Sequence, residues 1–61
     1  MKSIRDNIAI LCAEYDVNTV YAPQIEREVI DGWERGIAAG DLAPGTTPDK
    51  DDIYYTMAHM V

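Results

Sequence analysis

The chain has 61 residues, with 11 aspartates and glutamates against five lysines and arginines, and a formal net charge of −6. So short a chain forms one small domain at most, over residues 1–61, and has little room for both a core and a catalytic pocket. An acidic surface also repels the phosphates of nucleic acids, so we expect neither an enzyme nor direct nucleic-acid binding.

The first predicted helix spans 3–15. Ser3 followed three residues later by Asp6 is typical of a capped helix start. Cys12 lies on the apolar side of this helix, where we expect a buried, unreactive thiol. The apolar residues on that side recur at helical spacing: Ile4, Ile8, Leu11 and Tyr15.

The second predicted helix spans 23–39 and follows an extended connector over residues 16–22. Pro23 suits the first position of a helix, and Gly40 suits the position just after its end. Between them, apolar residues again recur at helical spacing: Ile25, Val29, Trp33 and Ile37.

The second helix also carries glycines four residues apart. Gly32, Gly36 and Gly40 fall within its apolar arc, where a missing side chain lets another segment approach closely. That segment is either part of the same chain or a second copy. The second alternative would make Gly32, Trp33 and Gly36 the seam of a homodimer.

The third predicted helix spans 48–60. Thr47 supplies an N-cap, Pro48 a first-turn proline and Asp49 a carboxylate that the helix dipole favours. Its apolar side follows at helical spacing: Ile53, Tyr54, Met57, Met60 and Val61. Three such helices packed on their apolar sides predict an all-α fold, a small three-helix domain or bundle.

The sequence offers no set of residues for catalysis, metal binding or a cofactor. His59 is the only imidazole, and no nucleophile lies at a spacing that pairs with it. Asp49, Asp51 and Asp52 lack the central glycine and late glutamate of a calcium loop. One histidine and one cysteine cannot hold zinc within a single chain. We therefore assign no catalytic, metal or cofactor residues.

The polar side of the second helix mixes both charges. Glu28, Asp31 and Glu34 share it with Arg27 and Arg35. Arg27 and Asp31, and Asp31 and Arg35, are four residues apart, a spacing that predicts ion pairs along the helix.

The third helix turns an acidic, aromatic side away from its apolar one. Tyrosine flanked by carboxylates is typical of protein interfaces, although a charged helix face is also the ordinary solvated surface of a small domain. The residues that we assign to partner binding are Glu28, Glu34, Asp51, Asp52, Tyr55 and His59. Their charge predicts a basic protein partner.

The segment 37–46, with sequence IAAGDLAPGT, resembles the start of GntR-type winged helix-turn-helix domains, whose first helix ends in an I-x-x-G-x-L-x-P-G turn. The resemblance covers about residues 24–60 and implies a role in transcription regulation. The family's Pro-Ser and basic residue are replaced here by Pro48-Asp49, followed by Asp51 and Asp52. The family's recognition helix and wing, which enter DNA grooves, have no counterpart before Val61.

The sequence thus predicts a non-enzymatic, acidic protein-binding module that inhibits or regulates a nucleic-acid-binding protein. Anti-CRISPR proteins and DNA mimics of phages and mobile elements are similar in size and charge. A diverged GntR-type fragment and a self-assembling structural protein are the alternatives. A single cysteine and the lack of an apolar run long enough for a membrane span predict a soluble, cytoplasmic location. No signal peptide is expected either, because Asp6 interrupts the first apolar stretch.

Overall fold

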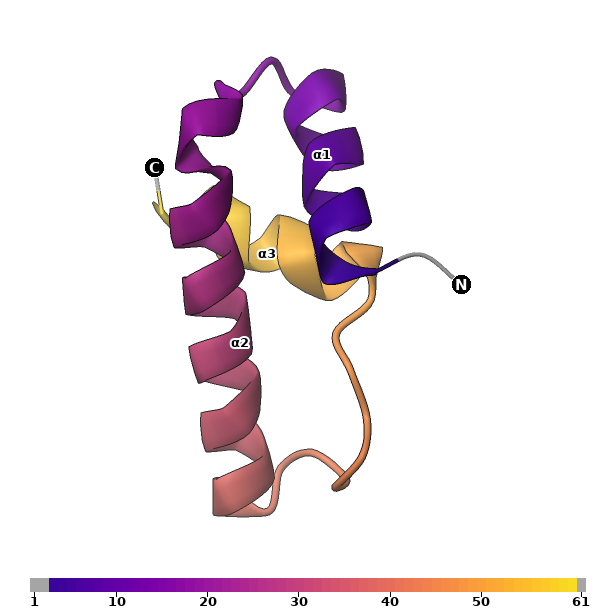
Figure 1. Cartoon of the computed structure of the whole chain (residues 1–61). Helices are drawn as coiled ribbons and strands as arrows, with labels where there is room; N and C mark the ends of the chain where they lie inside the picture. Colours follow the sequence, from indigo (N-terminus) through magenta and orange to yellow (C-terminus); the bar gives the residue numbers. More distant parts are fainter. Residues whose placement is uncertain (1–2, 61) are drawn as a thin grey trace.

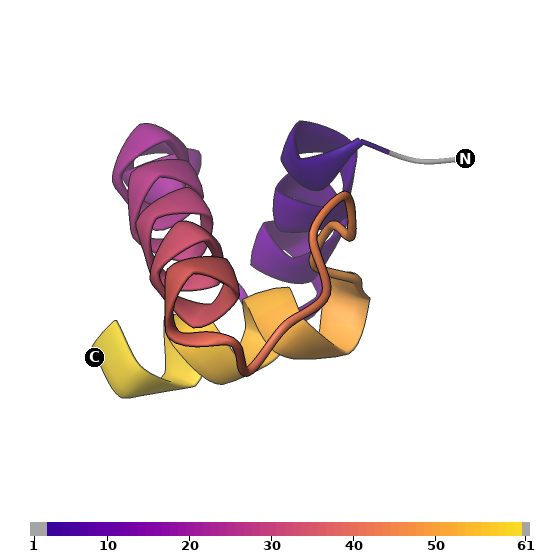
Figure 2. The ribbon, with the colours of Figure 1, turned by 90° about the horizontal axis from the view of Figure 1, so that it is seen from below.

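The computed structural model describes residues 3–60, which form three α-helices and no strand (Figure 1). These are α1 (Ile4–Glu14), α2 (Ala22–Ala39) and α3 (Lys50–Met60), with a short 3-10 turn, η1 (Thr19–Tyr21), before α2. Helices α1 and α2 run antiparallel beside each other, and α3 crosses one side of the pair (Figure 2). The prediction of a small all-α, three-helix fold is confirmed.

The start of α1 is closed by two reciprocal hydrogen bonds. The backbone N–H of Asp6 donates to Ser3 Oγ at 3.1 Å, and the N–H of Ser3 donates to Asp6 Oδ2 at 3.4 Å. This capping box satisfies two backbone donors that a helix start otherwise leaves free. The serine and aspartate spacing therefore predicted the start of this helix correctly.

The start and end of α2 also follow local chemistry. Pro23 lies in its first turn, where a missing N–H costs no hydrogen bond. Gly40 ends the helix in the left-handed conformation, with φ 85°. The connector before α2 is not extended as expected, because Asn18 accepts a hydrogen bond from the N–H of Val20 at 3.0 Å and closes η1.

Helix α3 begins two residues later than the sequence predicted. Its N-cap contacts are made by Asp49 rather than Thr47: the N–H of Asp52 donates to Asp49 Oδ1 at 3.1 Å, and the N–H of Asp49 donates to Asp52 Oδ2 at 3.0 Å. Pro48 lies outside the helix and is buried. Val61, predicted on the apolar side of this helix, lies outside the described residues.

All three helices contribute to one hydrophobic core. Its buried members come from the predicted apolar sides and include Cys12, as expected: Ile8, Leu11, Cys12, Ile25, Val29, Ile53 and Met57. No polar or charged side chain of residues 3–60 is buried with them. Tyr15 and Tyr54 lie at the edge of the core, exposed by 53% and 43%, with ring centroids 4.9 Å apart.

The lower half of α2 packs against a loop, because α2 is longer than its partner. At 1.5 Å per residue, α2 is about 27 Å long and α1 about 16 Å. The segment 40–49 runs back beside the uncovered part (Figure 1). Trp33 Nε1 donates a hydrogen bond to the carbonyl oxygen of Thr46 at 2.9 Å and so fixes the loop to the helix.

The two glycines inside α2 have different surroundings. A Cβ atom at Gly36 would lie 2.5 Å from Leu42 Cδ1, whereas a Cβ atom at Gly32 would meet nothing within 4 Å. The intrachain alternative therefore holds at Gly36, where a loop side chain takes the space. The packing expected at Gly32 is not formed within the chain.

Two ion pairs join α1 to the other helices. Arg5 Nε lies 2.7 Å from Glu26 Oε2, and Lys50 Nζ lies 2.7 Å from Glu14 Oε1. Hydrogen bonding to these carboxylates raises the pKa of both cations. All four side chains remain partly exposed, so each pair contributes little to stability.

The ion pairs predicted along α2 are wrong. Among residues 3–60, ion pairs within 4.0 Å form only between helices, so neither Arg27 nor Arg35 reaches Asp31. An exposed pair on one helix gains too little energy to hold two long side chains in place.

Candidate functional site

A shallow groove of about 250 Å³ lies between α2 and α3. We call it the α2–α3 groove. It brings together four residues that the sequence analysis singled out, Gly32 and Trp33 from α2 with Asp52 and Tyr55 from α3. The complete lining is Val29, Gly32, Trp33, Pro48, Asp52, Tyr55 and Thr56.

Tyr55 is the most prominent side chain of this groove. It is 67% exposed, and its ring lies against that of His59 with 4.2 Å between centroids. The two residues are one helical turn apart, so α3 itself positions the pair. A ring held against its neighbour in this way can bury a large area against a partner at low entropic cost.

The start of α3 holds carboxylates next to this ring. Asp49 accepts a hydrogen bond from the backbone N–H of Asp52, which lowers the pKa of Asp49 and favours its charged form. Asp52 accepts the reciprocal bond and lines the groove. Asp51 is exposed in the same first turn. All three aspartates favour the start of the helix, and Asp52 brings a carboxylate into the lining of the groove.

Glu28 extends the negative side of the groove along α2. It is exposed and lies one helical turn before Gly32, on the same side of the helix. Arg35 follows Gly32 by three residues on that side, so a positive charge lies toward the other end of α2.

Glu34 does not join the other predicted partner-binding residues. It follows Glu28 by six residues, which places it about 120° further round the helix axis. The predicted surface is therefore divided. Of the other members, Asp52 and Tyr55 line the α2–α3 groove, and Glu28, Asp51 and His59 each lie one helical turn from a residue that lines it.

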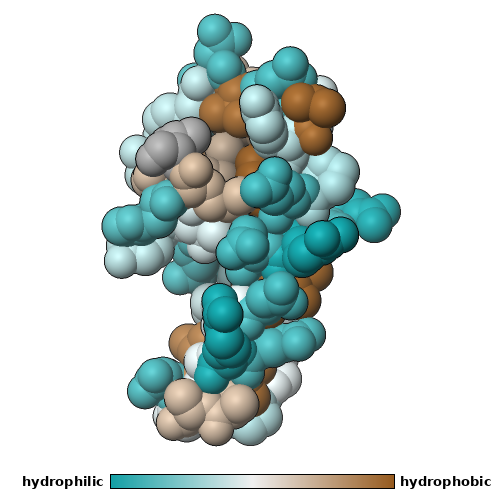
Figure 3. All heavy atoms as spheres, turned by 90° about the vertical axis from the view of Figure 1, so that its left-hand side faces the viewer, coloured by the Kyte–Doolittle hydropathy of each residue, from teal (hydrophilic) through white to brown (hydrophobic). Residues whose placement is uncertain are grey.

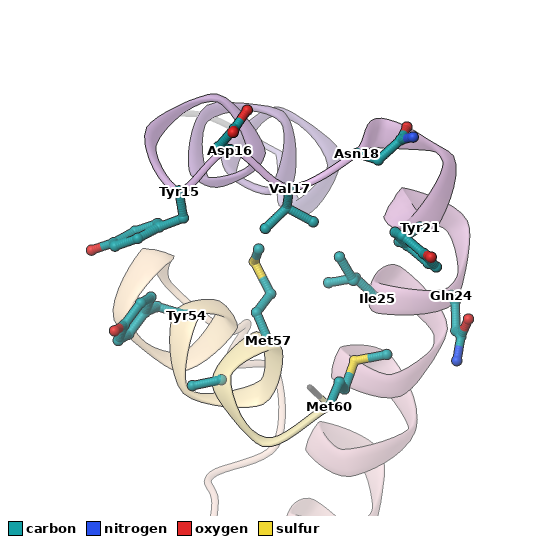
Figure 4. Close-up of a pocket in the computed structure, with 11 residues that line it drawn as sticks. Tyr15, Asp16, Val17, Asn18, Tyr21, Gln24, Ile25, Tyr54, Met57 and Met60 are labelled. Atoms are coloured by element: carbon teal, nitrogen blue, oxygen red, sulfur yellow. The ribbon is translucent and has the colours of Figure 1, made fainter.

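A second and larger groove of about 760 Å³ was not predicted from the sequence. We call it the tyrosine-rimmed groove. Tyr15 and Tyr54 lie at one edge and Tyr21 at the other, while apolar side chains point between them (Figure 4). The lining comes from the end of α1, the connector, the start of α2 and the last turns of α3: Tyr15, Asp16, Val17, Asn18, Tyr21, Gln24, Ile25, Tyr54, Met57, Ala58 and Met60.

This groove could not be predicted from helical periodicity, because part of its lining comes from the connector. Val17 and Tyr21 belong to no helical stripe, so periodicity assigns them no side. Tyr15 and Tyr54 were predicted on apolar helix sides, and only the crossing of α3 over α1 brings them to one edge. Tyr15 and Tyr21, which flank the connector in the sequence, were the one available signal.

The surface over α2 separates polar from apolar regions. Figure 3 shows hydrophilic side chains over the middle of this face, with hydrophobic patches near its upper and lower ends. The upper end is where the connector joins α2 (Figure 1).

The residue types that could carry chemistry lie apart. Cys12 is 1% exposed within the core, and His59 lies against Tyr55 on the surface. Residues 3–60 contain no group of three or more histidine, cysteine, aspartate or glutamate side chains that could hold a metal ion. Over the same range, no helix has both the length and the apolar character to cross a lipid bilayer.

Protein-family models, curated protein sequences and solved structures give no match to this chain. The resemblance of residues 24–60 to GntR-type domains stays a prediction. The fold and the net charge describe a small acidic three-helix protein.

Proposed function

We propose that this protein is a small acidic binding module that recognises a basic protein partner through the α2–α3 groove. The observation that carries this proposal is Tyr55, which is 67% exposed and lines the groove together with the carboxylate of Asp52. Exposed aromatic anchors surrounded by charge are the arrangement in which few residues supply most of the binding energy.

The distribution of charge supports a basic partner. The sequence carries 11 carboxylates, and ion pairs within residues 3–60 neutralise only Glu14 and Glu26. No charged side chain of that range is buried, so the negative charge faces the solvent. A protein surface that binds nucleic acid is complementary to such a field, so the module acts as an inhibitor or regulator of a nucleic-acid-binding protein.

The groove and the charge have separate roles in this proposal. Val29 and Trp33 give the groove an apolar base, and Tyr55 offers an aromatic edge. Burial of this area limits dissociation, whereas the carboxylates accelerate association and make it sensitive to salt.

The proposal is tested with two charge-matched double variants. Glu28→Gln with Asp51→Asn removes two charges from the α2–α3 side. Glu34→Gln with Asp41→Asn removes two exposed charges elsewhere. Asp52 is left intact, because its carboxylate accepts a hydrogen bond at the start of α3. Tyr55→Ala, as a third variant, removes the aromatic anchor.

Each variant is used as bait in lysate of the native host at low and high salt, and the recovered proteins are quantified by mass spectrometry. We expect wild type to recover a basic nucleic-acid-binding protein that salt or added DNA displaces. Its recovery falls at least ten-fold with the groove-side variant and with Tyr55→Ala, and stays near wild type with the control. Equal recovery by all the variants would refute the proposal.

A second candidate is a transcription-related module derived from a winged helix. The observation that favours it is the order of α2, a turn and α3 at the places that the GntR resemblance implies. Within this fold, however, Gly40 already serves as the cap of α2, and Leu42 packs at Gly36. A mobility-shift experiment separates the candidates, because an acidic module leaves DNA free whereas a DNA-binding domain retards it.

A further inference from the structure

Exposed large hydrophobic side chains of the described chain gather at the tyrosine-rimmed groove. Five large hydrophobic side chains are exposed by 43–69%: Tyr15, Val20, Tyr21, Tyr54 and Tyr55. Three of them line this groove, and Val20 precedes Tyr21 in the same 3-10 turn. Such clustering on a small protein marks an interaction site rather than scattered surface residues.

The interior of the groove is continuous with the core. Val17, Ile25, Met57 and Met60 point into it (Figure 4). Ile25 and Met57 are buried members of the core, whereas Val17 and Met60 are half-buried. An occupant would therefore extend the existing core instead of covering a polar surface.

The charge of the lining indicates which occupant fits. Asp16 is the only charged residue among the eleven that line the groove. A basic partner would contact more carboxylates on the α2–α3 side than at this groove. Two copies of this chain, in contrast, each have a net charge of −6. They repel one another least where they meet through an almost uncharged face.

We propose that a second copy of this chain docks on the tyrosine-rimmed groove. In a two-fold symmetric dimer the same face of each copy meets itself, so a projecting side chain on that face can fill the hollow of the other copy. Val20 is 69% exposed and precedes Tyr21, which lines the hollow; in this dimer Val20 of each copy enters the groove of the other.

The area that this face can bury indicates how tightly the two copies associate. A stable interface buries roughly 800 Å² per partner, from about 20–30 residues on each side. That is about one sixth of the 4522 Å² surface of the described protein. The groove lining together with Val20 supplies about a dozen residues, so the dimer is weak, micromolar or weaker.

The dimer leaves the proposed binding surface free. Helix α3 offers Tyr54, Met57 and Met60 to the tyrosine-rimmed groove, and Asp52 and Tyr55 to the α2–α3 groove. The inference thus does not depend on the proposed function, and either can fail alone.

Sedimentation equilibrium of the full chain, from about 10 µM to about 1 mM, tests the dimer over the range expected of weak interfaces. Val20→Glu places a charge on the projection without touching the core. Ala9→Glu adds the same charge at an exposed position of α1 that lines neither groove. We expect wild type to dimerise, with the dissociation constant raised at least ten-fold by Val20→Glu and changed less than two-fold by Ala9→Glu.

A nuclear magnetic resonance dilution series locates the interface. The methyl signals of Met57 and Met60 shift with concentration, whereas the indole N–H of Trp33, bonded to Thr46, stays constant. A monomer at every concentration would overturn the inference. So would a dimer that Val20→Glu leaves intact but Gly32→Leu disrupts, because that pattern places the seam on α2.

Discussion

Two glycines of α2 show how the same residue in the same helix can have different roles. The space beside Gly36 is filled by Leu42, whereas Gly32 faces open space. Their spacing in the sequence predicts that another segment approaches both glycines closely. Spacing gives the side of the helix on which a residue lies, but the loop 40–49 decides which glycine is covered.

Replacing Gly32 with alanine should stabilise the protein, because alanine has less backbone freedom to lose in a helix. We expect a gain of roughly 0.5–1 kcal/mol. Gly36→Ala is the matched comparison, and its gain is offset because its Cβ must displace Leu42. Urea unfolding followed by circular dichroism measures both. Equal stabilisation by the two substitutions would show that Leu42 does not pack at Gly36.

Substitution of a third glycine, Gly40, should instead lower the stability of the protein. Gly40 has φ 85°, a left-handed conformation that costs alanine roughly 1–2 kcal/mol. Gly40→Ala should therefore lower the urea midpoint. Asp16, with φ 55° after the end of α1, adopts the same region without being glycine. Short polar residues such as aspartate tolerate it better than others, which fits its place at this turn.

Most starts and ends of the helices are set by residues close to them in the sequence. The sequence placed the beginning of α1 and the end of α2 correctly, since Ser3, Asp6 and Gly40 act through bonds to backbone only a few residues away. It placed the beginning of α3 two residues too early. Pro48 is tolerated in a first turn but does not require one, and here it is buried in the lining of the α2–α3 groove.

The capping box of α3 should make the stability of this helix depend on pH. The backbone N–H of Asp52 lowers the pKa of Asp49 below its ordinary value of 3.8. A carboxylate with a lowered folded-state pKa contributes stability above its unfolded-state pKa and loses it as the pH falls through the folded-state value. Acidification below about 3.8 should therefore weaken the start of α3.

Asp49→Ala and Asp49→Asn separate charge from hydrogen bonding. Thermal unfolding at pH 7 should show a lower melting temperature for Asp49→Ala and a smaller loss for Asp49→Asn, which keeps an acceptor oxygen. The advantage of wild type over Asp49→Asn should shrink as the pH falls below 3.8 and the lowered pKa of Asp49 is approached. An advantage that stays undiminished as the pH falls would mean that the charge of Asp49 has no part in the cap.

For the whole molecule, seven buried side chains hold three helices together. Ile53 is 0% exposed, and α3 contacts both α1 and α2. The two ion pairs join the same elements but remain at the surface, so the core supplies most of the stability.

Ile53→Ala should unfold much of the population at room temperature. Truncating a buried isoleucine costs roughly 2–5 kcal/mol, which approaches the whole stability of a small domain. Ile10→Ala is the matched control, since Ile10 is only half-buried on α1 and should cost far less. Circular dichroism during heating measures both. A cooperative transition near the wild-type temperature for Ile53→Ala would contradict this account of the core.

Three helices, their apolar sides and the negative charge could be predicted from the sequence, because periodicity and capping act locally and composition sums over the chain. The sequence also predicted Tyr55 and His59 on the surface of α3. The packing of the helices adds that Arg5 pairs with Glu26, that Leu42 covers Gly36, and that a groove opens between tyrosines of separate segments. These contacts depend on the crossing of α3 over the antiparallel pair and on the return of loop 40–49. A local pattern carries no information on either.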